Sequence, residues 1–144
     1  RAYATLDVVI TRAERGHGKR AGVLSDYTFA VWKGGELVDI GKAYSGLTDA
    51  EIALMTQRLE ALTTEKLGGY HVVKPELVIE VAFDGLQPSS RHSSGFALRF
   101  PRIARLRDDK KAHEADTLET VQKLFEAQVG SGHREATPQL GLFK

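Results

Sequence analysis

Residues 98–110 read LRFPRIARLRDDK, and this stretch decides how the chain is expected to fold. Its five basic residues are Arg99, Arg102, Arg105, Arg107 and Lys110. Successive strand residues point to opposite faces, so an extended run predicts Arg99, Arg105 and Arg107 on one face. Pro101 cannot donate a ladder hydrogen bond and marks an edge or a bulge. Arginine forks match phosphate oxygens, so the stretch favours a nucleotide or a nucleic-acid backbone as partner.

The positive charge is local. Residues 91–111 hold seven Lys and Arg against two Asp, whereas the whole chain has a net charge of +1. A solvated basic strand is the alternative interpretation of such a run. Asp108 and Asp109 could also neutralise some of the arginines as surface ion pairs.

Length and composition predict one domain. The 144 residues lie in the usual range for a single core. The absence of cysteine excludes disulfides and cysteine-based zinc sites, and it fits a reducing cytoplasm. The five histidines include no pair spaced i and i+4, so we predict no metal site. No signal peptide or apolar run suited to a membrane is evident, so we expect a cytoplasmic protein without a membrane partner.

The apolar pattern predicts a mainly β fold. Residues 5–11, 27–32 and 37–43 favour strands, with Gly34 and Gly35 at a hairpin turn. Thr48 and Glu51 have capping-box spacing, which predicts a helix over 49–63. Further strands are expected over 77–84 and 95–107. A last helix is expected to begin after Asp116 or Thr117 and to run to about Ala127, with Val121, Leu124 and Phe125 as its apolar stripe. The pattern predicts a small Greek-key barrel of five or six strands with one inserted helix and a C-terminal helix. We place this domain at 1–128 and a flexible tail at 129–144.

A glycine-rich loop at 16–22 reads GHGKRAG, which superficially suggests a Walker phosphate loop. A Walker loop would need glycine at position 13 and serine or threonine at position 20, where this chain has Ala13 and Arg20. We instead predict a basic hairpin loop in which Arg15, Lys19 and Arg20 contact phosphates without reading bases.

The chain resembles the ATP-dependent DNA ligases, whose last motif is an Arg-Phe-Pro-Arg strand running into Arg-x-Asp-Lys. Residues 99–102 and 107–110 match both parts, and GHGKRAG at 16–22, KPELVIEV at 74–81 and ADT at 115–117 follow in family order. The resemblance covers about residues 5–128 and is to the bacterial type of ligase. It implies that the chain is the C-terminal oligonucleotide-binding (OB) barrel, and that the family's nucleotidyltransferase domain precedes it.

The resemblance implies a role for Arg107, Asp109 and Lys110 in closing over ATP and orienting its β- and γ-phosphates. Positive groups there stabilise the charge that develops on departing pyrophosphate. Asp109 would repel phosphate, so we interpret it as orienting Lys110 or Arg107. The family's nucleophilic Lys-x-Asp-Gly motif is absent, since the nearest string is Ala-Phe-Asp-Gly at 82–85. We therefore expect this chain alone to be inactive, with ATP and Mg²⁺ held mainly by the nucleotidyltransferase domain.

The resemblance also implies nicked duplex DNA as a partner, in strand-break sealing during repair or recombination. The predicted DNA contacts are Arg15, Lys19, Arg20, Arg99, Phe100, Arg102 and Arg105. Phe100 would act as an apolar wedge in the minor groove, and the alternative is ordinary barrel core.

The tail offers a separate hypothesis. Residues 139–143 read QLGLF, which resembles the peptide by which bacterial proteins dock on the sliding DNA clamp. The predicted clamp contacts are Gln139, Leu140, Leu142 and Phe143. Gly141 departs from the commoner polar residue, and a tail without a partner is the alternative.

Two other functions stay open. A free-standing single-strand-binding OB module would need exposed aromatics among the basic strands, whereas Phe29 and Trp32 are expected in the core. The related mRNA-capping guanylyltransferases pair a barrel with a nucleotidyltransferase domain too, although the two joined motifs resemble a ligase.

Overall fold

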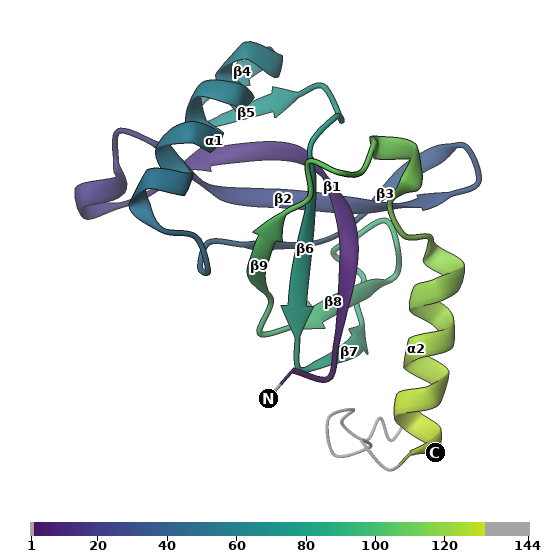
Figure 1. The fold of residues 1–144 in the computed structure, drawn as a ribbon. Helices are drawn as coiled ribbons and strands as arrows, with labels where there is room; N and C mark the ends of the chain where they lie inside the picture. The colour runs from purple at the N-terminus through teal and green to yellow at the C-terminus, as the bar shows by residue number, and fades with distance from the viewer. Residues whose placement is uncertain (1, 132–144) are drawn as a thin grey trace.

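The structure is a computed structural model, and it describes residues 2–131 (Figure 1). Its elements in chain order are β1 (Ala4–Arg15), η1 (Gly18–Arg20), β2 (Leu24–Lys33), β3 (Glu36–Ala43), α1 (Asp49–Leu62), β4 (Thr63–Leu67), β5 (Tyr70–Val73), β6 (Val78–Phe83), β7 (Gly85–Pro88), β8 (Phe96–Arg99), β9 (Arg102–Leu106), η2 (Ala112–Glu114) and α2 (Leu118–Gly130). Seven strands share one curled antiparallel sheet, and β7 and β8 form a separate two-stranded ribbon.

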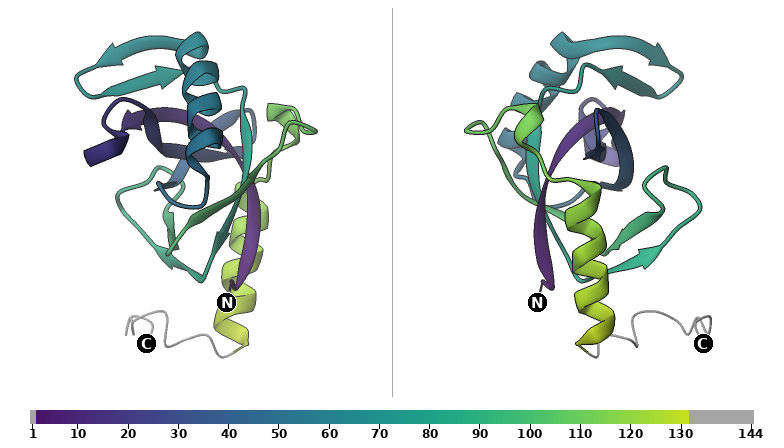
Figure 2. Two further views of the ribbon diagram at one scale, coloured as in Figure 1. Left: turned by 60° about the vertical axis from the view of Figure 1, so that its left-hand side comes forward. Right: turned by 90° about the vertical axis from the view of Figure 1, so that its right-hand side faces the viewer.

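Strand β1 is the centre of the sheet. Its first half pairs with β6, from Ala4 opposite Phe83 to Val9 opposite Val78, and its second half pairs with β2 and β5. Two register shifts along the β1–β2 pairing bend the strand, so the sheet curls around one interior. Figure 2 shows the curl from two further sides, with α2 running alongside the first half of β1.

Both faces of β1 are covered, which explains its uninterrupted apolar run. Val8 and Ile10 point into the main core. Val9 lies on the opposite face in a smaller cluster with Val78 and Ala115, against which Trp32 packs. A strand buried on both faces loses the alternation that marks a half-exposed one. The prediction that Phe29 belongs to the core is confirmed, and Trp32 is half-buried with its indole N–H donating to the Ala112 carbonyl at 2.8 Å.

The capping box predicted for the inserted helix is present. The Thr48 hydroxyl accepts from the Glu51 amide, and the Glu51 carboxylate accepts from the Thr48 amide. Helix α1 ends at Leu62, and the next residue already begins the β4–β5 hairpin, whose turn contains the glycine pair 68–69. The sequence reading missed this hairpin because β4 is exposed and polar, so it lacks strand alternation.

Helix α2 is tied to the β7–β8 ribbon by one buried side chain. Gln128 is fully buried, accepts from the Leu86 amide at 2.7 Å and donates to the Leu86 carbonyl at 2.9 Å. The stripe predicted for this helix is confirmed, since Val121 is buried and both Leu124 and Phe125 pack against the core. The helix begins after Thr117, as predicted, and ends at Gly130.

The OB-type barrel with two helices is confirmed, with more strands than predicted. Residues 2–131 form nine strands instead of five or six, because the hairpin β4–β5 is added, β7 follows the predicted 77–84 strand, and the stretch 95–107 is divided. Within that part of the chain, no helix is both long and apolar enough to span a membrane.

Candidate phosphate and nucleic-acid site

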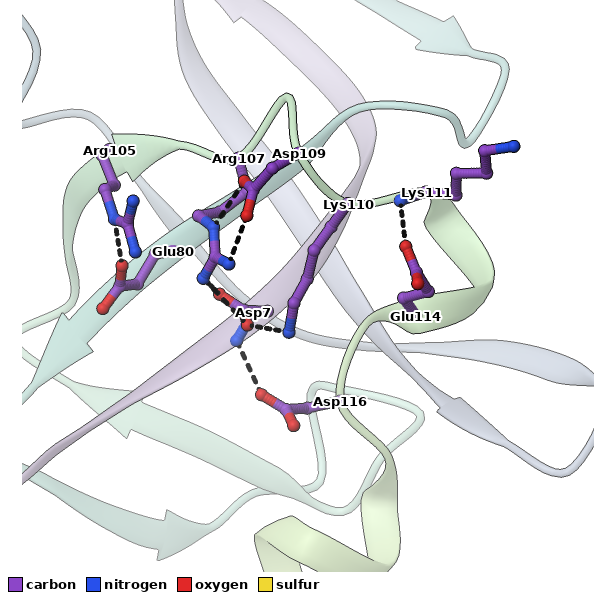
Figure 3. A network of polar contacts seen from close by, with 9 residues as sticks. All are labelled: Asp7, Glu80, Arg105, Arg107, Asp109, Lys110, Lys111, Glu114 and Asp116. Carbon is purple, nitrogen blue, oxygen red and sulfur yellow. Dashed lines mark hydrogen bonds and ion pairs between the residues drawn. The ribbon is translucent and has the colours of Figure 1, made fainter.

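The turn after β9 gathers the three predicted phosphate-orienting residues into one ion-pair network (Figure 3). The Arg107 guanidinium donates to Asp109 from Nε at 2.9 Å and from Nη2 at 2.8 Å. Its Nη1 lies 3.2 Å from Asp7 Oδ1, and Lys110 Nζ lies 2.7 Å from Asp7 Oδ2. Asp109 therefore contacts Arg107 and not Lys110, which answers the choice that the sequence left open.

The charges of Arg107, Asp109 and Lys110 are fixed near neutral pH. The hydrogen bond that Arg107 donates to Asp109 raises the pKa of Arg107, and the same bond holds the pKa of Asp109 well below its usual range. The hydrogen bond to Asp7 raises the pKa of Lys110. Arg107 and Lys110 therefore stay positively charged throughout the physiological pH range.

Asp7 is the residue that the sequence analysis missed. It is an acidic residue inside the apolar start of β1, and its side chain is only 13% exposed, close to the 14% of Arg107. Its backbone is held from the segment before α2, because the Asp7 amide donates to Asp116 Oδ2 and the Asp116 amide donates to the Asp7 carbonyl. The signal was present, since a lone acid in a β-branched apolar run requires a partner when it is buried.

A polar hollow of about 340 Å³ lies beside this network, and four cations line it: Arg58, Arg107, Lys110 and Lys111. Arg58 comes from α1 and pairs with Asp108 at 2.9 Å, so the inserted helix is tied to the same turn. Glu76 and Asp108 also line the hollow. Cations outnumber acids there, and the size and charge suit a chain of phosphate groups.

Phe100 stands away from the core. It is 67% exposed, it has a positive φ of 53°, and the Arg99 guanidinium carbon lies 5.5 Å from its ring centroid. The alternative that Phe100 is barrel core is therefore wrong. A non-glycine residue with positive φ is uncommon, and such strain is concentrated at functional sites.

The common face predicted for Arg99, Arg105 and Arg107 is wrong. Arg99 ends β8 in the two-stranded ribbon, whereas Arg105 lies on β9 in the main sheet. Pro101 separates these strands, and a register shift on β9 breaks the alternation again. Arg105 pairs with Glu80 at 2.6 Å beside the Arg107 network, and Arg102 pairs with Asp84 at 2.8 Å near Phe100.

The basic loop lies at the far end of β1. Arg15 ends that strand and donates to the Gly22 carbonyl, while Lys19 and Arg20 belong to the short helix η1. Arg20 is held by Asp49 of α1 at 2.9 Å. The structure therefore brings Arg107, Asp109 and Lys110 together in the turn after β9. Phe100 precedes β9, and the basic loop follows β1, so both lie apart from this turn along the fold.

Among residues 2–131, no group of three or more histidine or acidic side chains could hold a metal ion. The predicted clamp contacts Gln139, Leu140, Leu142 and Phe143 lie outside the described residues.

Comparison with known proteins decides the family. The model of the family described as "ATP dependent DNA ligase C terminal region" matches residues 20–110. The chain belongs to this family. This ligase C-terminal region is 62% identical over 135 residues to a probable DNA ligase of Opitutus terrae, which covers 92% of this chain and 13% of that protein. It is 59% identical over 128 residues to a probable DNA ligase of Koribacter versatilis, with 89% and 22% covered.

Solved structures agree with the fold. The ligase domain of LigD from M. tuberculosis superposes with a TM-score of 0.66 and 27% identity, covering 78% of this chain and 38% of that one. A mycobacterial DNA ligase D complexed with ATP and MES gives 0.61 at 27% identity, with 79% and 38% covered. The ligase C-terminal region spans no more than about a fifth of the two curated relatives, so it is one part of what those proteins contain.

Proposed function

We propose that this chain is the module of an ATP-dependent DNA ligase that completes the ATP site for lysine adenylation and then clamps nicked duplex DNA. The observation that carries the proposal is the separation of two basic surfaces. One is the hollow at Arg107 and Lys110, suited to a polyphosphate, and the other runs past the exposed Phe100. A domain that meets two anionic partners in turn needs two such surfaces.

At the first surface, Arg107 and Lys110 orient the β- and γ-phosphates of ATP and stabilise the charge that grows on departing pyrophosphate. Asp109 keeps the Arg107 fork in place through two hydrogen bonds. Asp7 holds Lys110 and the remaining Arg107 nitrogen until phosphate oxygens replace its carboxylate. The nucleophilic amine comes from the nucleotidyltransferase domain, because this chain has alanine at position 82 in its nearest Lys-x-Asp-Gly string.

Asp7 and Asp109 are already paired with cations at this surface, so they do not form a cage for Mg²⁺. Mg²⁺ typically binds through one or two carboxylates plus substrate phosphates. In this proposal the phosphates and the nucleotidyltransferase domain hold the ion, and this chain supplies only the fixed positive groups.

At the second surface, Phe100 enters the minor groove beside the nick, while Arg99 and Arg102 contact the flanking phosphates. Arg15, Lys19 and Arg20 extend the backbone contacts, and Arg105 lies nearest the adenylation surface. The physiological role is strand-break sealing in repair or recombination at the nucleoid. A further partner is the sliding clamp, through Gln139, Leu140, Leu142 and Phe143.

The test of the first role is to replace Lys110 in the full enzyme and measure its two steps separately. We expect Lys110→Ala to slow lysine adenylation by at least about a hundredfold, because it removes charge stabilisation at the departing pyrophosphate. Sealing of nicks that already carry adenylate should change far less, because pyrophosphate has already left. Lys33→Ala, at the exposed end of β2, serves as the charge-matched control. Equal loss in both steps would contradict the assignment of Lys110.

A further inference from the structure

An exposed aromatic side chain lies between the two groups of predicted DNA contacts, and neither the sequence analysis nor the family match gives it a role. Tyr44 directly follows β3 and is 71% exposed, the highest value among the large apolar and aromatic side chains of residues 2–131. Isolated exposed aromatics are ordinary on protein surfaces, so its neighbours decide whether it has a function.

Tyr44 lines two hollows at once. The first, of about 410 Å³, is shared with Lys42, Phe100 and Arg102. The second, of about 400 Å³, is shared with Arg15, Arg20 and the loop at 16–17. Tyr44 is the residue common to both, so it connects the Phe100 turn with the basic loop into one surface, which we call the Tyr44 track.

The turn that carries Tyr44 is locked to the strand that follows Phe100. The Ile103 amide donates to the Ser45 carbonyl at 2.8 Å. Gly46 has a φ of 116°, and a Cβ atom added to it would lie 2.0 Å from the Ile103 carbonyl oxygen. The two backbones therefore touch, and the spacing between Tyr44 and Phe100 is set before any partner arrives. Such pre-organisation lowers the entropy lost on binding.

The charges along the track point to a phosphodiester backbone. Its cations are Arg15, Arg20, Lys42 and Arg102. Each of the last three has a carboxylate partner: Asp49 for Arg20, Glu14 and Asp26 for Lys42, and Asp84 for Arg102. Asp26 is the acidic residue that lines the second hollow. Ion-paired cations keep fixed positions, and incoming phosphates can share or replace the carboxylates.

Two aromatics on separate turns suit a duplex better than a single strand. Single-strand platforms present several aromatics in succession on which neighbouring bases stack. Here Phe29 is fully buried and Trp32 is half-buried under its own cluster. Side chains that project from turns beside a basic surface are typical of minor-groove contacts.

We propose that Tyr44 is a DNA-contacting residue that inserts with Phe100 into the minor groove of nicked duplex DNA and makes the basic loop and the Arg99–Arg102 turn one continuous binding surface. This inference rests on the proposed function and adds a specific residue and a path for the DNA. The Tyr44 track is assigned to DNA and not to ATP, because Tyr44 does not line the hollow at Arg107 and Lys110.

The test is binding of the full 144-residue chain to labelled nicked duplex, intact duplex and single-stranded DNA by fluorescence anisotropy over a salt series. We expect Tyr44→Ala to weaken nicked-duplex binding by at least about fivefold, the low end for aromatic contacts with bases. Tyr44→Phe should stay within about twofold of the parent chain, because it keeps the ring. Leu67→Ala is the matched control, since Leu67 is 41% exposed on β4 and lines neither hollow.

The salt series separates an aromatic contact from an ionic one. Tyr44→Ala should leave the dependence of log K on log salt unchanged, whereas Arg15→Ala should lower its slope by roughly one. If Phe100→Ala weakens binding and Tyr44→Ala does not, the role of Tyr44 is wrong and the proposed function stands. If the parent chain binds none of the DNA forms, the role of Tyr44 and the DNA-clamping part of the proposed function are wrong, whereas the adenylation part stands on its own test. If the parent chain prefers single-stranded DNA and Tyr44→Ala abolishes that preference, the minor-groove role is wrong and Tyr44 instead stacks on unpaired bases.

Discussion

The contact between Gly46 and Ile103 predicts a large loss of stability from one added methyl group. In Gly46→Ala the new Cβ would lie 2.0 Å from the Ile103 oxygen and 2.8 Å from its nitrogen, so the backbones must separate by about 1 Å. That movement breaks the hydrogen bond from the Ile103 amide to Ser45, which contributes about 1 kcal/mol. Non-glycine residues at a φ such as 116° add about 1–3 kcal/mol of strain. We expect a total loss near 3 kcal/mol.

Gly68→Ala is the control that separates the steric clash of an added Cβ from the strain of a positive φ. Gly68 also has a positive φ, 61°, but a Cβ there meets no atom within 4 Å. We expect it to lose only about 1 kcal/mol, the usual left-handed penalty. For a domain of this length, thermal melting should fall by about 10 °C in Gly46→Ala and by about 4 °C in Gly68→Ala. Equal losses in differential scanning calorimetry would refute the close approach, and with it the locked spacing of Tyr44 and Phe100.

Three further outcomes follow from the buried contacts. Gln128→Ala leaves the Leu86 amide and carbonyl unpaired, so urea denaturation should show a loss of about 3 kcal/mol, against almost none for the exposed Gln122→Ala. Asp7→Asn removes the carboxylate that competes with phosphate for Lys110, so inorganic pyrophosphate should bind about three- to tenfold more tightly in calorimetric titration, and weaker binding would contradict this role. Burial lowers the pKa of His71, so the unfolded chain binds more protons than the folded chain near that pKa. The free energy of unfolding should therefore fall as the pH drops below about 6.5. In His71→Asn the slope of melting temperature against pH should become flatter.

Local signals in the sequence predicted most of the fold. The capping box at Thr48 and Glu51, the glycine pair after β2 and the apolar stripe of α2 each act within a few residues, and each is confirmed. The β4–β5 hairpin was missed because its outer strand is polar and exposed. A sequence pattern reveals a strand through the side chains that one face buries, and β4 buries almost none of its side chains.

The candidate site likewise contains residues that the sequence predicted and residues that it did not. The motif residues Arg107, Asp109 and Lys110 are close in sequence and could be found by resemblance to a family. Asp7 lies about a hundred positions away, and only the pairing of β1 with β6 and of β6 with β9 brings it to them. Tyr44 was missed for a related reason, since its neighbours in space come from β1, β3 and the turn before β9.

The strand alternation predicted for residues 98–110 breaks next to the exposed Phe100. Alternation holds along one uninterrupted strand, and the 98–110 run contains a proline and a register shift. The interruption places Phe100 outside the sheet at a positive φ, where a regular strand would have buried it or paired its backbone. The departure from pattern and the exposed aromatic therefore have one origin.

The segment from residue 107 to residue 116 is fastened at both ends. Its start is held by the Arg107 amide on the Val78 carbonyl, and its end by the Trp32 amide on the Asp116 carbonyl and by Asp116 on the Asp7 backbone. Arg107 and Lys110 are thus fixed to the body of the barrel by the backbone hydrogen bonds at both ends of this segment. In the proposed function, a rotation of the whole domain would bring these two cations to ATP or withdraw them, without rearranging the backbone of the segment. The length and stiffness of whatever joins this barrel to its catalytic partner would then set the timing of adenylation, and engineering that joint should alter the reaction without changing one residue of the motif.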